Sequence, residues 1–140
     1  MSQENVEIVR RVYEEWWAGL ERDDPGAVFD SEAVTDDCEF TVEGGMPDGR
    51  SVWRGREEYV EWFRTWTSEF EGWSLRLERL MDAGRDRVVA LTHQSGTGKE
   101  SGVPVELNVG VVWELKEGRV IRARNYVSHA EALEAAGLSG

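Results

Sequence analysis

The residues with the clearest chemical potential lie near the C-terminal end of the chain, on both sides of a predicted turn. Glu117-Gly118 predicts a two-residue hairpin turn, because glycine adopts positive φ at little cost. The cross-strand pairs expected from this turn are Trp113 with Arg122, Val111 with Arg124, and Val109 with Tyr126. A sheet face that mixes guanidinium and phenol groups with apolar bulk suits a pocket that binds an anion or stabilises an oxyanion. The alternative is a surface held together by salt bridges.

A histidine provides the candidate for proton transfer. His93 follows Val89 and Leu91 at every second position of a predicted strand, which favours an inward-facing side chain. Because histidine titrates near neutral pH, an inward His93 would be the most capable general base or acid in this chain. The alternative is a hydrogen-bonded core histidine. The candidate catalytic residues are His93, Arg124 and Tyr126.

Aromatic side chains provide the expected walls of the pocket. The chain has seven tryptophans, and each indole N–H needs a partner, which suits a partly open cavity better than a dry core. Trp17 and Trp66, on predicted helices, are placed to stack on a flat ligand, with ordinary core packing as the alternative. The candidate ligand-binding residues are Tyr13, Trp17, Trp66, Trp113, Arg122 and Ser128.

Other chemistries find less support in the sequence. Histidines and carboxylates do not cluster at ligand spacing, so we expect no metal and no other cofactor. Cys38, the single cysteine, lies between Asp37 and Glu39, whose charges should raise the pKa of its thiol and lower its reactivity. The run 96–99 lacks the spacing of a phosphate-binding loop and lies between two predicted strands.

Length and charge limit the partners. At 140 residues the chain fits one domain, 1–140, and its 16 lysines and arginines against 28 aspartates and glutamates give a formal net charge of −12. This charge opposes binding to nucleic acid or to an anionic membrane. The N-terminus has neither a basic start nor an apolar run, and no stretch reaches the roughly 20 apolar residues of a membrane helix. With one cysteine and no leader, we expect a cytoplasmic protein.

The elements that must position these residues follow from hydrophobic periodicity. Helical spacing comes first along the chain and alternating spacing afterwards, which favours an α+β fold over an alternating parallel sheet. We expect helices over 6–20, after Asp24-Pro25, over 57–70 and over 130–136, and strands over 38–42, 51–53, 73–81, 87–95, 105–115 and 119–126.

The order of these elements resembles the SnoaL-like branch of the nuclear transport factor 2-like (ketosteroid isomerase-like) superfamily. The resemblance includes the 36–40 strand entry, the segment 53–58 that opens a helix, and the final hairpin followed by a short helix. It implies a curved, mainly antiparallel sheet wrapped around three N-terminal helices, forming a cone with an open pocket. It also implies a small hydrophobic or aromatic ligand and a homodimer through the outer sheet face, where Val112, Ile121, Ala123 and Val127 are expected.

The resemblance leaves two functions open. One is a cofactor-free cyclase or isomerase, or a hydrolase, of the SnoaL-like type; a cyclase or isomerase would act by proton transfer on a hydrophobic, polyketide-like carbonyl substrate. The other is a non-catalytic protein that binds an aromatic or acidic metabolite, or a dimeric interaction module. The acid/base aspartate of SnoaL-like cyclases corresponds to Ser128, and a serine needs a neighbouring base to transfer protons near neutral pH. The position of the aspartate base of ketosteroid isomerases falls near Val42-Glu43 in this chain. Limonene-epoxide hydrolases need an Asp–Arg–Asp set, and this sequence offers arginines but no two aspartates expected to face inward.

Overall fold

The structure, a computed structural model, describes residues 2–45 and 49–138 and confirms the α+β fold. Helices α1 and α2 and a short 3-10 helix, η1, come first, and most strands follow, as expected from the sequence. The elements are α1 (Ser2–Glu21), η1 (Pro25–Asp30), β1 (Val34–Val42), β2 (Val52–Arg54), α2 (Gly55–Thr67), β3 (Phe70–Gly84), β4 (Arg87–Gly98), β5 (Pro104–Leu107), β6 (Gly110–Lys116), β7 (Arg119–Tyr126) and α3 (His129–Ala135).

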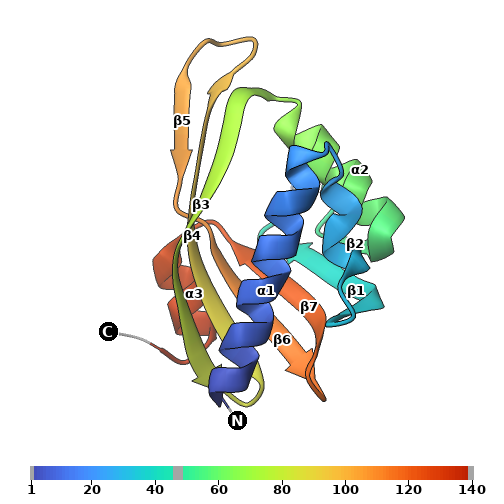
Figure 1. Ribbon diagram of the computed structural model, residues 1–140. Helices are drawn as coiled ribbons and strands as arrows, with labels where there is room; N and C mark the ends of the chain where they lie inside the picture. The colour runs from blue at the N-terminus through green and yellow to red at the C-terminus, as the bar shows by residue number, and fades with distance from the viewer. Residues whose placement is uncertain (1, 46–48, 139–140) are drawn as a thin grey trace.

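The described residues form one curved, seven-stranded sheet. Its strand order is β2-β1-β7-β6-β4-β3, and β5 pairs with β4 outside this path. Only β1 and β7 pair in parallel, so the sheet is mainly antiparallel, as predicted. Figure 1 shows α1 crossing one face of the sheet, while β3, β4 and β5 extend beyond the other strands. The predicted strand 105–115 is interrupted at residues 108–109, so that β5 and β6 are separate strands on the same edge of β4.

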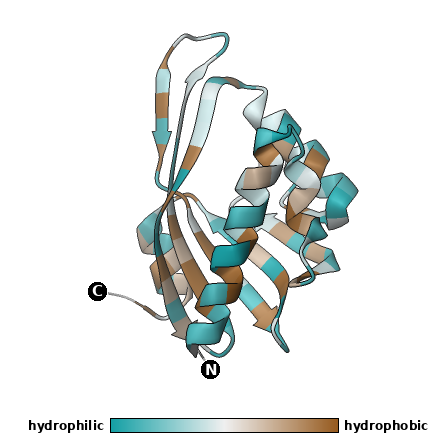
Figure 2. Ribbon diagram, viewed as in Figure 1, coloured by the Kyte–Doolittle hydropathy of each residue, from teal (hydrophilic) through white to brown (hydrophobic). Residues whose placement is uncertain are grey.

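Helix α1 forms because apolar side chains recur at three-to-four spacing along it. This buried stripe consists of Val6, Val9, Val12, Tyr13 and Trp16. Gly19 allows the next segment to fold back, because a Cβ atom at that position would lie 2.2 Å from the Cβ atom of Ala27 in η1. Figure 2 shows hydrophilic colour on much of the outward surface of α1 and hydrophobic colour in the strands behind it.

Apolar clusters lie on both faces of the sheet. The larger one joins α1, η1 and α2 to the concave face, and the smaller one joins Ala132 and Ala136, from α3 and its C-cap, to Val89 and Val112. Gly110 allows α3 to pack against the sheet in the smaller cluster, since a Cβ atom at this position would lie 2.4 Å from the Cβ atom of Ala132. Strand β4 is consequently buried on both faces, and Val88, Val89 and Ala90 are each 0% exposed.

The final hairpin departs from its predicted register. Lys116 pairs with Arg119 and Leu115 with Val120, as expected from the turn, but Glu114 then pairs with Arg122. Ile121 is therefore an extra residue in β7, a β-bulge, and every later pairing shifts by one. The observed pairs are Trp113 with Ala123, Val112 with Arg124, Val111 with Asn125, and Gly110 with Tyr126.

This shift also changes the outer face. Ala123, predicted to lie outside, lines the interior cavity, and Val112 belongs to the cluster beneath α3. Val127 is exposed, and Ile121 lies in the bulge. The continuous apolar outer face predicted for a homodimer is therefore wrong. Among the described residues, no helix has the length and apolar character needed to cross a membrane.

Candidate functional site

A cavity lies between helices α1 and α2 and the concave face of the sheet. Its volume is about 70 Å³, counted as space open to the centres of water molecules. On this measure one water needs about 10–15 Å³, so the cavity has room for several waters or for a small organic molecule. Half of its 16 lining residues are aromatic: Tyr13, Trp16, Phe40, Tyr59, Trp62, Phe63, Trp73 and Trp113.

The rest of the lining is almost entirely uncharged. Its aliphatic members come from α1, η1 and the strands, and its polar members are Thr92, Gln94 and Asn125. Among the described residues, no aspartate, glutamate, histidine, lysine or arginine lines the cavity. A ligand would thus meet aromatic faces and edges and a few neutral polar groups.

Two tyrosines bring hydroxyl groups to this lining. Burial raises the pKa of Tyr13 far above its ordinary value, although the indole N–H of Trp113, which donates to its oxygen at 3.2 Å, opposes the rise. Burial is also the main cause that raises the pKa of Tyr59, and the charge that Tyr13 would carry if ionised raises it further. The indole N–H of Trp16 interacts with the Tyr59 hydroxyl outside ideal hydrogen-bond geometry. Both tyrosines are therefore neutral phenols across the physiological range.

Protein contacts hold the polar side chains in place. Gln94 Oε1 accepts the indole N–H groups of Trp66 and Trp73, at 3.1 and 3.0 Å. Asn125 Nδ2 donates to the carbonyl oxygen of Thr41 at 2.9 Å. These bonds use the oxygen of Gln94 and the nitrogen of Asn125, and they leave the amide nitrogen of the first and the amide oxygen of the second for a ligand.

The aromatic walls brace one another. Tyr13 and Trp113 meet edge to face with ring centroids 5.4 Å apart, and Phe63 and Trp73 do so at 5.3 Å. Trp62 is stacked on Trp53, which lies outside the lining, at 5.1 Å. Such pairs fix ring orientations, so the shape of the cavity is largely set before a ligand enters.

A smaller hollow lies next to the cavity, beneath the extended ends of β3 and β4. Trp66, Phe70, Val105 and Leu107 line it, and it shares Trp73 and Gln94 with the main cavity. Gln94 therefore forms part of the wall between the two spaces.

His93 lies outside the cavity lining, contrary to the prediction that it faces inward. Its neighbours Thr92 and Gln94 line the cavity, while His93 Nδ1 lies 2.9 Å from Asn108 Oδ1 and Nε2 lies 3.0 Å from Glu106 Oε1. The alternation of apolar residues was misleading because β4 is apolar on both faces, with α3 covering the outer one.

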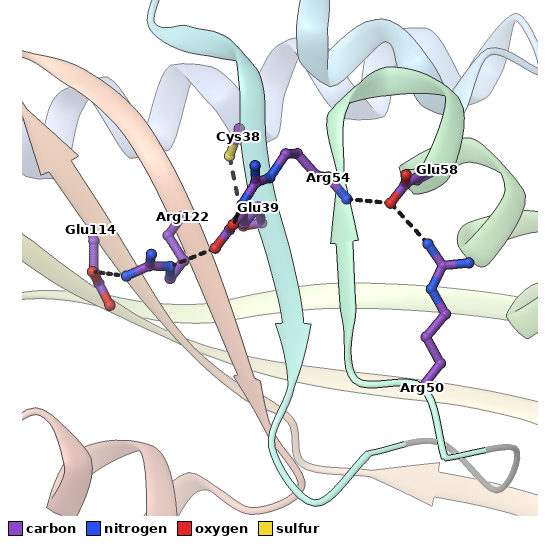
Figure 3. A network of polar contacts seen from close by, with 7 residues as sticks. All are labelled: Cys38, Glu39, Arg50, Arg54, Glu58, Glu114 and Arg122. Atoms are coloured by element: carbon purple, nitrogen blue, oxygen red, sulfur yellow. Dashed lines mark hydrogen bonds and ion pairs between the residues drawn. The ribbon is translucent and has the colours of Figure 1, made fainter.

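Arg122, Arg124 and Tyr126 also lie outside the cavity, because the bulge at Ile121 turns them to the outer face. Arg122 contacts Glu39 and Glu114 at 3.1 Å each, and Arg124 Nε lies 2.6 Å from Glu114 Oε2. Figure 3 shows this network continuing through Glu39 to Arg54. The salt-bridged surface, the alternative kept open from the sequence, is the arrangement observed. Tyr126 packs against the apolar cluster under α3.

The predicted ligand-binding residues divide in the same way. Tyr13 and Trp113 line the cavity, whereas Trp17 packs against the surrounding core and Trp66 lines the smaller hollow. Ser128 is the N-cap of α3, and its Oγ atom accepts from the backbone N–H of Glu131 at 3.1 Å. Its hydroxyl thus has a structural role at this helix end.

Cys38 has the properties expected of an unreactive thiol. Its side chain is buried, and burial, followed by the charges of Asp37 and Glu39, raises its pKa to about 12. Among the described residues, no group of three or more histidine, cysteine, aspartate or glutamate side chains is arranged to hold a metal ion.

Sequence reasoning overlooked several residues of the lining. Tyr59, Trp62 and Phe63 belong to the apolar face predicted for the third helix, so their helical spacing carried a usable signal. Asn125 and Gln94 could not be recognised, because their orientation depends on the bulge in β7 and on which face of β4 is concave.

The chain belongs to the SnoaL-like domain family, whose model matches residues 9–123. A comparison with curated proteins gives no match.

Solved structures share the fold over nearly the whole chain. An NTF2-like protein from Burkholderia thailandensis E264 is 26% identical, with a TM-score of 0.68, over 91% of this chain and 94% of its own. A protein proposed to be a SnoaL-like polyketide cyclase, from Jannaschia sp. CCS1, is 20% identical, with a TM-score of 0.71, over 100% and 95%. A ketosteroid isomerase-like protein from Catenulispora acidiphila DSM 44928, solved in complex with trimethylamine, is 18% identical, with a TM-score of 0.65, over 91% and 92%.

Proposed function

We propose that this protein binds a neutral, largely apolar small molecule with an aromatic part, and that it does so without acid–base catalysis. The observation that carries this proposal is the lining of the cavity, which combines eight aromatic side chains with no ionised group among the described residues. Aromatic walls with a few placed polar groups are typical of sites for small organic ligands.

The absence of a proton-transfer group from the lining favours binding over cyclase or isomerase chemistry. General acid–base catalysis needs a group that titrates near the working pH within reach of the substrate. Tyr13 and Tyr59 are held neutral by burial, and His93 contacts Glu106 and Asn108 outside the lining. At 20% identity the Jannaschia relative shares the fold alone. It therefore supports a pocket protein of this family, without support for cyclase chemistry.

The charge of the lining also selects among ligands. An acidic metabolite would need a cation in the cavity, and the arginines predicted for that role lie on the outer face. An organic cation would find aromatic faces but no carboxylate in the described lining, so the cost of removing it from water would be only partly offset. The Catenulispora complex with trimethylamine supports a small occupant in this fold.

Titration of tryptophan fluorescence with neutral aromatic compounds, including ethylbenzene and acetophenone, tests the proposal. We expect saturable binding, because Trp16, Trp62, Trp73 and Trp113 line the cavity. Ala123→Leu fills part of the cavity, so a ligand can bury less of its own apolar surface there, at a loss of about 0.8 kcal/mol for each methylene left unburied. Overpacking of the lining adds strain, and together these effects should weaken binding by about tenfold or more. Ala18→Leu, on the exposed side of α1, is the matched control and should bind normally.

Two outcomes would contradict the proposal. One is that no compound of this class binds to the folded protein. The other is that Ala123→Leu binds as well as the wild type, which would place the ligand elsewhere. The homodimer and the cytoplasmic location expected from the sequence stay predictions.

A further inference from the structure

The smaller hollow continues the cavity along strand β4. Alternate residues of a strand face the same side of the sheet, and three such positions of β4 follow one another here. Thr92 lines the cavity, Gln94 lines both spaces, and Gly96 lines the hollow. On β3, Trp73 is likewise shared by the two spaces. The cavity and the hollow therefore lie in line, with Gln94 and Trp73 between them.

The hollow is small and mainly apolar. Its volume is about 10 Å³ on the measure used for the cavity, which is room for about one water at most. Across the sheet, Val105 of β5 pairs with Gly96, and Leu107 pairs with Gln94. Gly96 allows Phe70 to pack closely, since a Cβ atom at this position would lie 3.0 Å from the Cβ atom of Phe70. A hydrocarbon chain in the cavity could extend into this space only if Gln94 gave way.

The side chain of Gln94 is held firmly in its place. Its Oε1 atom accepts the indole N–H groups of Trp66 and Trp73, at 3.1 and 3.0 Å. Trp66 packs edge to face on Phe70 at 5.0 Å, and Trp73 does so on Phe63 at 5.3 Å. A ligand that displaced the amide would deprive both indoles of their acceptor. Each such loss costs about tenfold in affinity, whereas a further buried methylene adds about three- to fourfold.

We propose that Gln94 is the specificity-determining residue that limits the length of the ligand. This inference rests on the proposed function and adds a size class to it: an aromatic ring with a short apolar substituent that ends at the Gln94 amide. The hollow adjoins this amide on its far side, so a smaller side chain at position 94 would open it to a longer substituent.

A homologous series of ligands measures this limit. The n-alkylbenzenes from ethylbenzene to hexylbenzene differ only in chain length, and fluorescence titration or calorimetry gives a dissociation constant for each. In the wild type we expect the affinity to rise about three- to fourfold with each methylene until the chain reaches Gln94, and to fall with longer chains. The limiting length is the chain length that binds most tightly.

Gln94→Ala should increase the limiting length. Loss of the amide joins the hollow to the cavity, so the affinity should continue to rise for about two further methylenes, a gain of about tenfold for the best ligand. The matched control is Gln94→Glu, because a carboxylate of nearly the same size keeps oxygen acceptors for both indole groups. This control should keep the limiting length of the wild type, although its charge lowers the affinity for every member of the series.

Val105→Phe tests whether the added space is the hollow. Val105 lines the hollow and lies outside the cavity lining, so a phenyl group at this position fills the hollow alone. In the double variant with Gln94→Ala, the limiting length should return to that of the wild type. As a single substitution, Val105→Phe should change each dissociation constant by less than about twofold, since the chain does not pass Gln94.

Several results would overturn the inference while a binding cavity remains. They are an unchanged limiting length in folded Gln94→Ala, an increased one in Gln94→Glu, and an increase that persists in the double variant. If Gln94→Ala does not fold, the wild type and Val105→Phe decide. A steady rise through hexylbenzene in the wild type, or a shorter limit in Val105→Phe, would show that the chain already enters the hollow. If no alkylbenzene binds to the wild type, the proposed function itself fails.

Discussion

Gln94 determines how two of the tryptophans around the cavity are held. Its side-chain oxygen accepts indole N–H groups from Trp66 on α2 and Trp73 on β3, so one amide links a helix to two strands. Removal of this acceptor would leave two part-buried indole N–H groups without a partner. The free-energy penalty for an unpaired buried donor usually exceeds the net stabilisation from a single hydrogen bond.

Gln94→Leu should therefore lower the free energy of unfolding by about 1–3 kcal/mol. The measurement is urea unfolding followed by far-ultraviolet circular dichroism, with tryptophan emission as a second signal. Ser95→Ala is the control, because the adjacent serine meets Ser74 on the exposed side of the same strand and should change stability little. Equal stability of Gln94→Leu and wild type would show that the indole groups find other partners.

Glu39 links Arg54 and Arg122 across three strands of the outer face (Figure 3). The hydrogen bond from Arg54 holds the pKa of Glu39 below its usual value, burial partly opposes this, and Arg122 lowers it further. Because the pKa is lower in the folded protein, the unfolded chain binds more protons at acidic pH. The stabilisation is complete above the unfolded pKa and is lost as the pH falls through the folded value.

We expect Glu39→Gln to lower stability by about 1–2 kcal/mol at pH 7 and to lose this deficit as the pH approaches 2. Thermal midpoints at pH 7, 5, 4, 3 and 2 would show a flatter acid dependence than in the wild type. Glu7→Gln is the control, since Glu7 forms an exposed pair with Arg10 at 3.6 Å. A deficit that stays constant with pH would contradict the assigned role of the Glu39 charge.

At the scale of elements, the contact between β6 and α3 depends on a missing side chain. The backbone at Gly110 approaches Ala132, and α3 covers the outer face of β4 and β6 through this contact. The buried outer face explains why strand alternation failed to orient His93. Periodicity indicates the buried face only when the other face meets water.

Gly110→Ala should destabilise the protein by about 1–3 kcal/mol, because the new methyl group overlaps Ala132 and α3 must shift. Ala132→Gly in the Gly110→Ala background should recover part of this loss despite the low helix propensity of glycine. Urea unfolding of the two single variants and the double variant gives the coupling energy. Additive effects of the two substitutions would contradict the packing described here.

The elements were predictable to different degrees. The stripe of α1 and the aromatic face of α2 follow from helical spacing, and Glu117-Gly118 fixed the first two pairs of the hairpin. The bulge at Ile121 has no glycine or proline to announce it, and it decides which side of β7 meets the cavity. The fold could therefore be predicted, but the site could not. One unpaired residue in β7 turns the functional side chains to the other face of the sheet, while the order of the elements stays the same.

At the scale of the whole molecule, the charge of −12 is the main long-range force. Like charges repel in the compact state and less so in the expanded unfolded chain, and salt screens them beyond a Debye length of about 10 Å at 0.1 M. Raising sodium chloride from 20 to 300 mM should therefore increase the thermal midpoint by about 2–4 °C. The effect should vanish near the isoelectric pH. A fall in the midpoint at pH 7 would show that surface ion pairs outweigh the repulsion.

The assembly of the molecule remains a prediction that light scattering can check. The homodimer was expected through an apolar outer face, but that face contains Arg122, Arg124 and Glu114 in ion pairs and is partly covered by α3. A dimer through this surface would be polar, so we expect its dissociation to be favoured by high salt. A monomer mass at every protein concentration would remove the dimer from consideration.

The extra residue in β7 also suggests how relatives with different chemistry could arise. If Ile121 paired with Glu114, the pairing counted from the turn would return, and both guanidinium groups and the Tyr126 phenol would face inward. Formation of the bulge would expel them and leave an interior of rings. Ancestral chains of this architecture thus need only gain or lose one bulge, with no change of length, to exchange an uncharged interior for an ionic one.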